Sequence, residues 1–186
     1  MKSSRLICVL SLLIMLASTG CVTEHKKHRH MWSGIKQAIA VVQPTSGNSC
    51  QGTVQFTQDG NSVQVVAEIH GLTPNAQHAI HIHQFGDATA PDGKSAGGHY
   101  NPENHDHALP GALFRHAGDL GNLAADASGH AYYELKVDNI SIAGLKNPII
   151  GRGVIVHAKA DDGGQPTGNA GPRIGCGVIG IAKPME

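Results

Sequence analysis

The sequence is poor in aromatic and charged residues. Of its 186 residues, only 4% are Phe, Trp or Tyr and 15% are Asp, Glu, Lys or Arg. The 14 basic residues are balanced by 14 acidic ones, so the chain lacks the basic excess typical of nucleic-acid binding, and we expect no nucleic-acid partner. The low charged fraction also argues against a coiled coil or a charged tail protein, while a hydrophobic fraction of 40% indicates a folded chain. The length suits one domain.

The sequence also lacks an apolar run long enough for a transmembrane helix, which needs roughly 20 residues. Its main apolar run, residues 6–17, follows Lys2 and Arg5 and ends in small residues. This layout is typical of a secretory signal peptide. We therefore interpret residues 1–20 as a signal and expect the domain to be exported.

Small residues stand directly before Cys21, as at the processing site of bacterial lipoproteins, although Ser18 occupies a position where leucine is usual. This pattern predicts that Cys21 receives lipid, becomes the new N-terminus and provides the only attachment to a membrane. Localisation would then be the periplasm or cell envelope. Ordinary secretion with an incidental cysteine is the alternative.

Residues 21–34 follow as a lipid-anchor candidate and a tether without apolar periodicity. The tether contains imidazole and thioether groups that suit copper or zinc, in His25, His28, His30 and Met31. We keep two interpretations, a solvated spacer and an accessory copper-capturing tract, because short His-rich segments are only compositional signals.

No window of the remaining chain, residues 35–186, sustains a helix-period apolar stripe over three turns. The 24 glycines and nine prolines suit turns between short strands. Alternating or β-rich segments predict strands at residues 35–42, 53–57, 63–69, 79–83, 131–137, 153–158 and 176–182. The stretches 85–122 and 161–172 are rich in Gly, Pro, Asn and Asp and are expected to be long functional loops.

Histidine is unusually abundant, with 13 residues, which points to metal. His81 and His83 stand at i and i+2 in one predicted strand, so both rings project from the same face. Such a pair supplies half of the nitrogen site that Cu(II) prefers, and His157 lies in another strand. A carboxylate and more histidines, with the ligand chemistry of zinc, occupy the first long loop: His99, His105, His107, His116 and Asp119.

Five segments in this order resemble the copper–zinc superoxide dismutase family. They are HIHQFGD (81–87), SAGGHYNP (95–102), RHAGDLGN (115–122), GRGVIVHAKADD (151–162) and TGNAGPRIGCGVIGIA (167–182). The resemblance implies an all-β fold, an eight-stranded antiparallel Greek-key β-barrel of the immunoglobulin-like sandwich type with two long functional loops. It also implies copper and zinc as cofactors and superoxide as substrate.

The resemblance further assigns the ligands. Copper would be held by His81, His83, His99 and His157, and zinc by His99, His107, His116 and Asp119. His99 would bridge the metals and act in catalysis. His105 lies two residues before His107, but spacing favours His107.

Four other residues match the family's supporting groups. Asp161 would link a copper histidine to a zinc histidine, and Arg173 would attract and orient the anion beside copper. Thr167 would narrow the channel opposite Arg173, and Lys159 would add positive potential for steering, unless it is simply a solvated surface lysine.

One of the chain's departures from the family concerns a cysteine. The stretch between His83 and His99 lacks the cysteine that normally pairs with the one in GCGV, so Cys176 has lost its partner. Barrel closure and an oxidising compartment favour a replacement bond, and we expect a Cys50–Cys176 disulfide.

The motifs predict an enzyme that converts superoxide to dioxygen and hydrogen peroxide in the bacterial cell envelope. A copper-delivery or copper-buffering lipoprotein on the same fold, without turnover, is the competing hypothesis, because fold alone does not establish function. Segments that resemble family dimer contacts indicate a homodimer: residues 85–86, 149–151 and 178–181.

Overall fold

The computed structural model describes residues 34–183. Eight strands and one short 3₁₀ helix, Lys94–Ala96, make up its regular structure. The strands are β1 (Gln37–Pro44), β2 (Gln51–Asp59), β3 (Ser62–His70), β4 (Gln77–His83), β5 (Asp119–Ala124), β6 (Ala131–Val137), β7 (Gly153–His157) and β8 (Arg173–Ile181). Each of the seven segments predicted as strands overlaps a strand of the structure, with boundaries shifted by a few residues.

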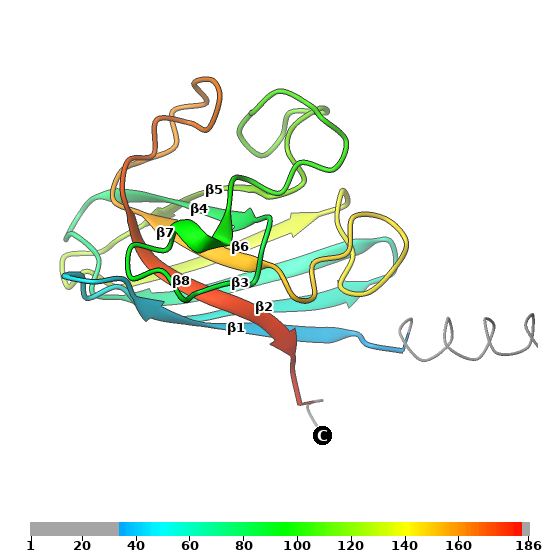
Figure 1. Ribbon diagram of the computed structural model, residues 1–186, viewed down its shortest axis with the longest axis horizontal. Coiled ribbons are helices and arrows are strands. Elements are labelled where there is room, and N and C mark those ends of the chain that lie inside the picture. The colour runs from blue at the N-terminus through cyan, green and yellow to red at the C-terminus, as the bar shows by residue number, and fades with distance from the viewer. Residues whose placement is uncertain (1–33, 184–186) are drawn as a thin grey trace, which may run out of the picture. The chain divides into compact units, whose positions relative to one another are not determined.

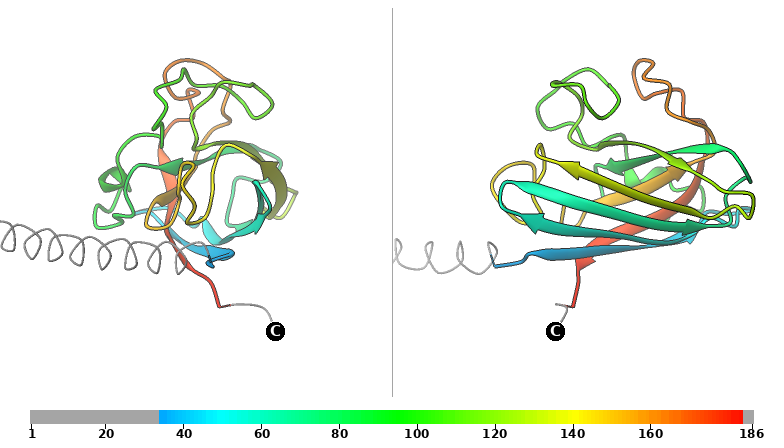
Figure 2. Two further views of the ribbon diagram at one scale, coloured as in Figure 1. Left: turned by 90° about the vertical axis from the view of Figure 1, so that its right-hand side faces the viewer. Right: turned by 180° about the vertical axis from the view of Figure 1, so that it is seen from behind.

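The strands form a single curved sheet in the order β5-β4-β7-β8-β1-β2-β3-β6. All neighbouring pairs in this order are antiparallel. The sheet curls until β5 and β6 approach each other, which gives the nearly closed barrel seen in Figures 1 and 2. The all-β prediction with eight antiparallel strands is confirmed.

Period-two alternation of side chains builds the barrel interior. In β3, Val63, Val65, Ala67 and Ile69 are fully buried, whereas the residues between them are more exposed. Removing these aliphatic side chains from water stabilises the fold by roughly 1.5–3 kcal/mol for each large one. The alternation read from the sequence therefore identified the inner face.

Strand β5 is the element that the sequence pattern missed. Its residues, DLGNLA, were expected in large part to belong to the long loop 85–122. Gly121 at φ 85° and Asn122 interrupt the β-branched pattern of a typical strand. Pairing with β4 nevertheless extends this segment, and the register places Asp119 directly opposite His81.

The chain after β4 and the chain between β7 and β8 rise from the same side of the barrel (Figures 1 and 2). The first segment covers residues 84–118 and the second covers residues 158–172. These two long loops enclose the histidines described below.

The expected Cys50–Cys176 disulfide is wrong, because both residues are free, buried thiols in the structure. Cys50 Sγ lies 2.7 Å from the point where a Cβ on Gly175 would stand. Because consecutive strand residues face opposite ways, Cys176 points away from Cys50 and packs with Ala96 and Ile155 instead. Burial raises the pKa of Cys50 to about 12, so its thiol stays protonated.

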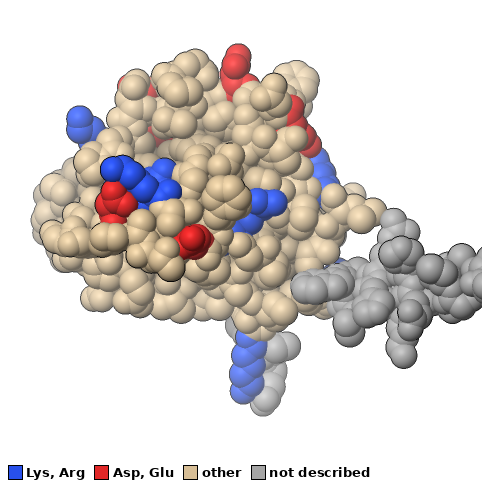
Figure 3. Space-filling view, viewed as in Figure 1, with Lys and Arg blue, Asp and Glu red and all other residues tan. Residues whose placement is uncertain are grey.

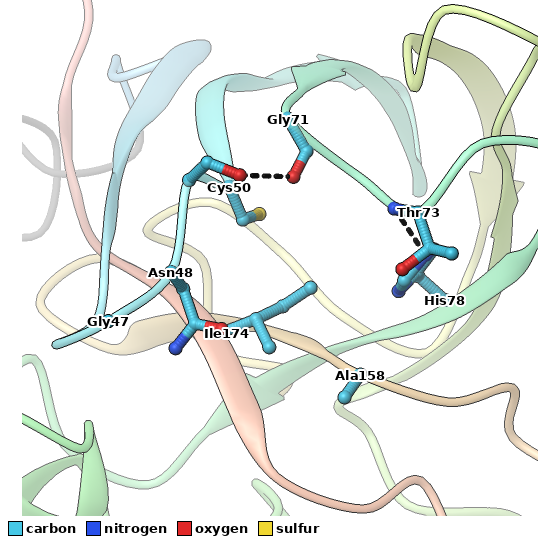
Figure 4. A pocket seen from close by; sticks show the side chains of 9 residues that line it. Gly47, Asn48, Cys50, Gly71, Thr73, His78, Ala158 and Ile174 are labelled. Carbon is cyan, nitrogen blue, oxygen red and sulfur yellow. Dashed lines mark hydrogen bonds between the residues drawn. The ribbon is translucent and has the colours of Figure 1, made fainter.

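Cys50 lies beside a cavity of about 390 Å³, and Figure 4 shows the side chains that line it. His78 and Ile174 also line this cavity. The cavity therefore adjoins the strand ends, and within residues 34–183 none of the predicted metal ligands lines it.

Charged groups of both signs are few and intermixed on the face shown in Figure 3.

Among residues 34–183, no helix has the length and apolar character needed to cross a membrane. The predicted signal, Cys21 and the tract containing His25, His28, His30 and Met31 lie outside the described residues.

Candidate metal centre

Strand β4 positions the first two candidate ligands. His81 and His83 are 0% and 1% exposed, and they alternate with Ile80 and Ile82, which are also fully buried. A strand buried on both faces is explained by the barrel interior on one side and the overlying loops on the other. The two imidazoles therefore occupy buried space beneath the loops.

The other two members of this group come from neighbouring backbone. His99 forms an isolated antiparallel bridge with His83, and His157 ends strand β7, which pairs with β4. The ring centroid of His81 lies 4.0 Å from that of His99 and 5.1 Å from that of His157. One nitrogen from each of these four buried rings lies within 4.8 Å of the others.

A second buried group shares His99. It comprises His99, His107, His116 and Asp119, whose donor atoms also lie within 4.8 Å of one another. Oxygen Oδ1 of Asp119 lies 3.1 Å from His99 Nδ1 and 3.3 Å from His116 Nδ1, and Oδ2 lies 3.0 Å from His107 Nδ1. Three nitrogens around one carboxylate match the ligand chemistry of a tetrahedral zinc site.

Hydrogen bonds orient the rings of the first group. His83 Nδ1 lies 2.9 Å from the Gly97 carbonyl oxygen, and His157 Nδ1 lies 3.1 Å from the Gly171 carbonyl oxygen. A carbonyl accepts only, so each Nδ1 carries the proton and each Nε2 keeps its lone pair. Both Nε2 atoms, together with His81 Nδ1, are buried without a hydrogen-bond partner. Such orphaned nitrogens fit a bound metal ion.

The buried carboxylate of Asp161 connects the two groups. Its Oδ2 accepts a hydrogen bond from His81 Nε2 at 2.9 Å, and its Oδ1 accepts one from His107 Nε2 at 2.8 Å. Gly168, at φ 77°, leaves room for this carboxylate, because a Cβ there would stand 2.1 Å from Asp161 Oδ1. Outer carboxylates of this kind fix the tautomer and ring orientation of metal-binding histidines.

Burial keeps three of the imidazoles neutral. It lowers the pKa of His83 to about 2, of His157 to about 3 and of His99 to about 4. For His107, burial acts in the same direction, but hydrogen bonds to Asp119 and Asp161 outweigh it and raise the pKa to about 9. A metal ion that enters the second group therefore displaces a proton from His107.

The carboxylate of Asp119 stays ionised despite its burial. Burial acts to raise its pKa, but hydrogen bonds from His107, His116 and His99 hold it well below its usual range. The second group thus carries a fixed negative charge, which favours a cation among its donors.

Comparison with known proteins agrees with this geometry. Residues 50–179 match the family model described as Copper/zinc superoxide dismutase (SODC). The chain belongs to this family. Its function is the dismutation of superoxide, with copper and zinc as cofactors.

Individual relatives are similar over most of the chain. An extracellular superoxide dismutase [Cu-Zn] from Brugia pahangi is 44% identical over 156 residues, which cover 78% of this chain and 76% of the relative. A superoxide dismutase [Cu-Zn] from Paramecium bursaria Chlorella virus 1 is 45% identical over 154 residues, 78% of this chain and 79% of the relative. One from Humicola lutea is 44% identical, and 99% of its length is covered.

In this superoxide dismutase, Arg173 lies beside the first group. It pairs with His157 across strands β7 and β8. Its Nη1 and Nη2 donate hydrogen bonds of 2.6 Å to the carbonyl oxygens of Gly93 and Gly97. The carbonyl oxygen of Gly97 accepts hydrogen bonds from both Arg173 and His83, so the guanidinium lies close to this ring.

The other predicted residues are more peripheral. His105 is not in either group, because its Nδ1 lies 3.2 Å from the Arg115 carbonyl oxygen. Thr167 is exposed in loop 158–172, and Lys159 is exposed with its aliphatic stem against Gly171.

Three polar residues that support the dismutase site were missed in the sequence. His78 is fully buried, with Nδ1 2.8 Å from the His157 carbonyl oxygen. Asn122 holds the backbone of Asp161 through hydrogen bonds of 2.7 and 2.9 Å. Gln165 likewise holds the backbone of His107 through bonds of 3.1 and 2.7 Å. Their hydrogen-bond partners are distant in sequence and could not be predicted from local patterns. The one local signal was that His78 directly precedes the segment predicted as a strand at 79–83.

Replacing Asp161 with Asn tests the connection between the groups. An amide keeps one acceptor oxygen and replaces the other with an NH₂ donor, so one of the two imidazole N–H groups loses its partner. We expect the affinity for copper and zinc to fall about 10–100-fold. Metal analysis after dialysis against a chelator measures the loss.

Asp162→Asn is the matched control, because this neighbouring carboxylate is exposed and contacts only its own loop, at Gly164 and Asn169. Equal metal retention by the two variants would contradict the positioning by Asp161.

Proposed function

We propose that this family member dismutates superoxide with copper held by His81, His83, His99 and His157, and zinc held by His99, His107, His116 and Asp119. The observation that carries this assignment is the shared position of His99 between two buried donor groups. The first group is all imidazole, which suits copper, and the second adds a carboxylate, which suits zinc.

The reaction converts two superoxide ions and two protons into dioxygen and hydrogen peroxide. Copper supplies the change of oxidation state, whereas zinc has no redox chemistry and contributes charge and structure. Everything else is left to the protein, which must attract the anion, orient it and supply protons.

Arg173 attracts and orients the anion. Two of its donors are fixed by the carbonyl oxygens of Gly93 and Gly97, which holds the guanidinium plane in place. The remaining N–H groups and the positive charge are available to superoxide. Lys159 adds positive potential, and Thr167 limits the width of the approach.

His99 handles a proton. Its Nδ1 lies against Asp119 and His116, so Nε2 is the atom directed to the first group. We assign to Nε2 the proton that is held and then given to the peroxide product.

Pulse radiolysis of the copper- and zinc-loaded protein tests this function directly. We expect superoxide to decay catalytically at a rate proportional to protein concentration. A loaded protein that leaves the spontaneous decay unchanged would favour the alternative, a copper-delivery or copper-buffering protein. The fixed guanidinium of Arg173 argues for turnover, because metal delivery has no need of an anion-orienting group.

We propose that the protein is exported and held at the bacterial cell envelope, with residues 1–20 as signal, residues 21–34 as anchor and tether, and residues 35–186 as the enzyme domain. The signal-like leader and Cys21 support this localisation, and one relative is named as extracellular. Mass spectrometry of the N-terminal peptide from the exported protein tests it: a lipid on Cys21 is expected, and an unmodified Cys21 would contradict the anchor.

The tether is proposed to capture copper. Deletion of residues 22–31 removes His25, His28 and His30 but leaves both buried groups intact. We expect the fully loaded enzyme to keep its rate, while recovery of activity from the copper-free state slows when copper is limiting. Excess copper should remove the difference. Equal recovery under limiting copper would identify the tract as a spacer only.

A homodimer is proposed through the surface around Phe85 and Val178. These side chains and Ile181 are 57%, 41% and 59% exposed, an apolar exposure that suits an interface. Ile149 and Ile179, which were expected among the contacts, are 0% and 1% exposed and belong to the core.

Val178→Asp tests this interface by sedimentation velocity. A buried, unpaired carboxylate is costly, so we expect monomers. Leu113→Asp, at an 86% exposed position in loop 84–118, is the control and should sediment like the parent. Identical sedimentation of all three proteins would contradict the interface.

A further inference from the structure

A third set of metal-ligand side chains lies on the outer surface of the barrel and shares no residue with the two buried groups. Glu68 and His70 belong to β3, and His130 directly precedes β6. One donor atom from each of the three lies within 4.8 Å of the others. Strands β3 and β6 are neighbours in the sheet, as Figure 1 shows.

Strand register explains why these side chains converge. Glu68 pairs with Tyr132 and Ile69 pairs with Ala131, so the next rung brings His70 opposite His130. The two imidazoles stack with centroids 4.5 Å apart and planes inclined by 21°. Because Glu68 and His70 are two residues apart in one strand, both point outward.

The distances are close to those of a metal site. Glu68 Oε1 lies 4.0 Å from His70 Nε2 and 3.7 Å from His130 Nε2. Tetrahedral coordination of zinc with bonds of 2.0–2.2 Å separates donor atoms by about 3.4 Å. The side chains of Glu68 and His70 are 57% and 54% exposed, so small rotations can close the remaining tenths of an ångström.

The ring of His130 has one nitrogen without a partner. Its Nε2 is buried and makes no hydrogen bond, although the Glu68 carboxylate is near. Its Nδ1 lies 3.8 Å from Asp126 Oδ2, on a carboxylate whose other oxygen accepts hydrogen bonds from the backbone N–H of Ser128 and of His130. Asp126 therefore lies on the Nδ1 side of the ring, and Nε2 is the nitrogen that faces Glu68.

We propose that Glu68, His70 and His130 form a surface binding site for a divalent ion of the zinc and copper class, in addition to the two buried sites. Two imidazoles and one carboxylate suit these borderline ions, whereas magnesium and calcium prefer oxygen donors. The three ligands come from one face of two adjacent strands, so the site needs only local side-chain movement.

Titration with Zn²⁺ tests the site on the full exported chain already loaded with copper and zinc. His70→Ala and His130→Ala should each bind one zinc ion fewer than the parent, or bind it at least about tenfold more weakly. The N-terminal His tract is present in every protein, so its contribution cancels in the difference. Glu134→Gln is the matched control, because Glu134 is exposed on the same face of β6 but is not one of the three ligands. This variant should bind zinc like the parent.

Two further measurements complete the test. The rate of superoxide decay should be equal in the parent and both histidine variants, since these residues lie outside the buried groups, and this equality also shows that the variants are folded. Anomalous scattering from zinc-soaked crystals of the parent should show a peak among the three side chains. Equal zinc stoichiometry in all four proteins, or no anomalous peak at this position, would overturn the proposal.

Discussion

Replacing His157 with Ala is expected to abolish superoxide dismutation while zinc is retained. His157 contributes one of the orphaned nitrogens of the first group, and its ring takes no part in the second group. Because even the loss of an outer partner costs about 10–100-fold in metal affinity, the loss of a direct ligand should exceed about 100-fold for copper. Parallel measurement of copper, zinc and superoxide decay reports the effect.

The control for this substitution is His105→Ala. His105 lies only two residues before His107, a member of the second group, but its Nδ1 contacts a backbone carbonyl oxygen. The His105→Ala protein should therefore retain both metals and full activity. The backbone carbonyl of His157 remains available to His78 in the His157→Ala protein, which preserves the barrel contact. Zinc lost with copper intact would show that the two groups have been assigned to the wrong metals.

Reversal of charge at Arg173 should produce the second large effect. Arg173→Glu places a carboxylate beside the approaching anion and next to the carbonyl oxygens of Gly93 and Gly97, which then lose the guanidinium hydrogen bonds. We expect the second-order rate constant to fall by about 10²–10³-fold at low salt, the upper part of the range of electrostatic effects on association, because the charge is reversed and not only removed. Copper content should be unchanged.

Arg173→Lys separates charge from geometry. Lysine keeps the positive charge but lacks the planar fork that bonds both carbonyl groups, so a smaller loss, about tenfold, is expected. Added salt should reduce the difference between the Lys and Glu variants, because it screens exposed charges. Equal rates for parent, Lys and Glu proteins at low salt would remove Arg173 from the mechanism.

Much of the fold could be read from local patterns. The alternation of Val63, Val65, Ala67 and Ile69 predicted a strand with one buried face, and the structure confirms it. Strand β5 could not be predicted in this way, because its glycine and asparagine resemble a loop. Only pairing with β4 makes that segment extended, and such pairing is a long-range property.

The cysteines show the same limit at the level of single side chains. The sequence analysis expected Cys50 to lie beside the strand that carries Cys176. In the structure the Cys50 sulfur does reach that strand, at Gly175. It could not decide which way Cys176 faces, because a shift of one residue reverses the face of a strand. The register of β8 turned Cys176 toward Ala96 and Ile155, and the bond does not form.

Local spacing predicts that His81 and His83 face the same way, because residues at i and i+2 of a strand share a face, whereas the full ligand set was implied by the family resemblance. The link through Asp161 was expected from the family resemblance, and both of its hydrogen bonds are present. Only the folded barrel shows that Arg173 is held by two loop carbonyl oxygens and that His70 meets His130. Those contacts join residues far apart in the chain. They depend on strand register and loop closure, which are set by the packing of the whole barrel and not by the local pattern of residues.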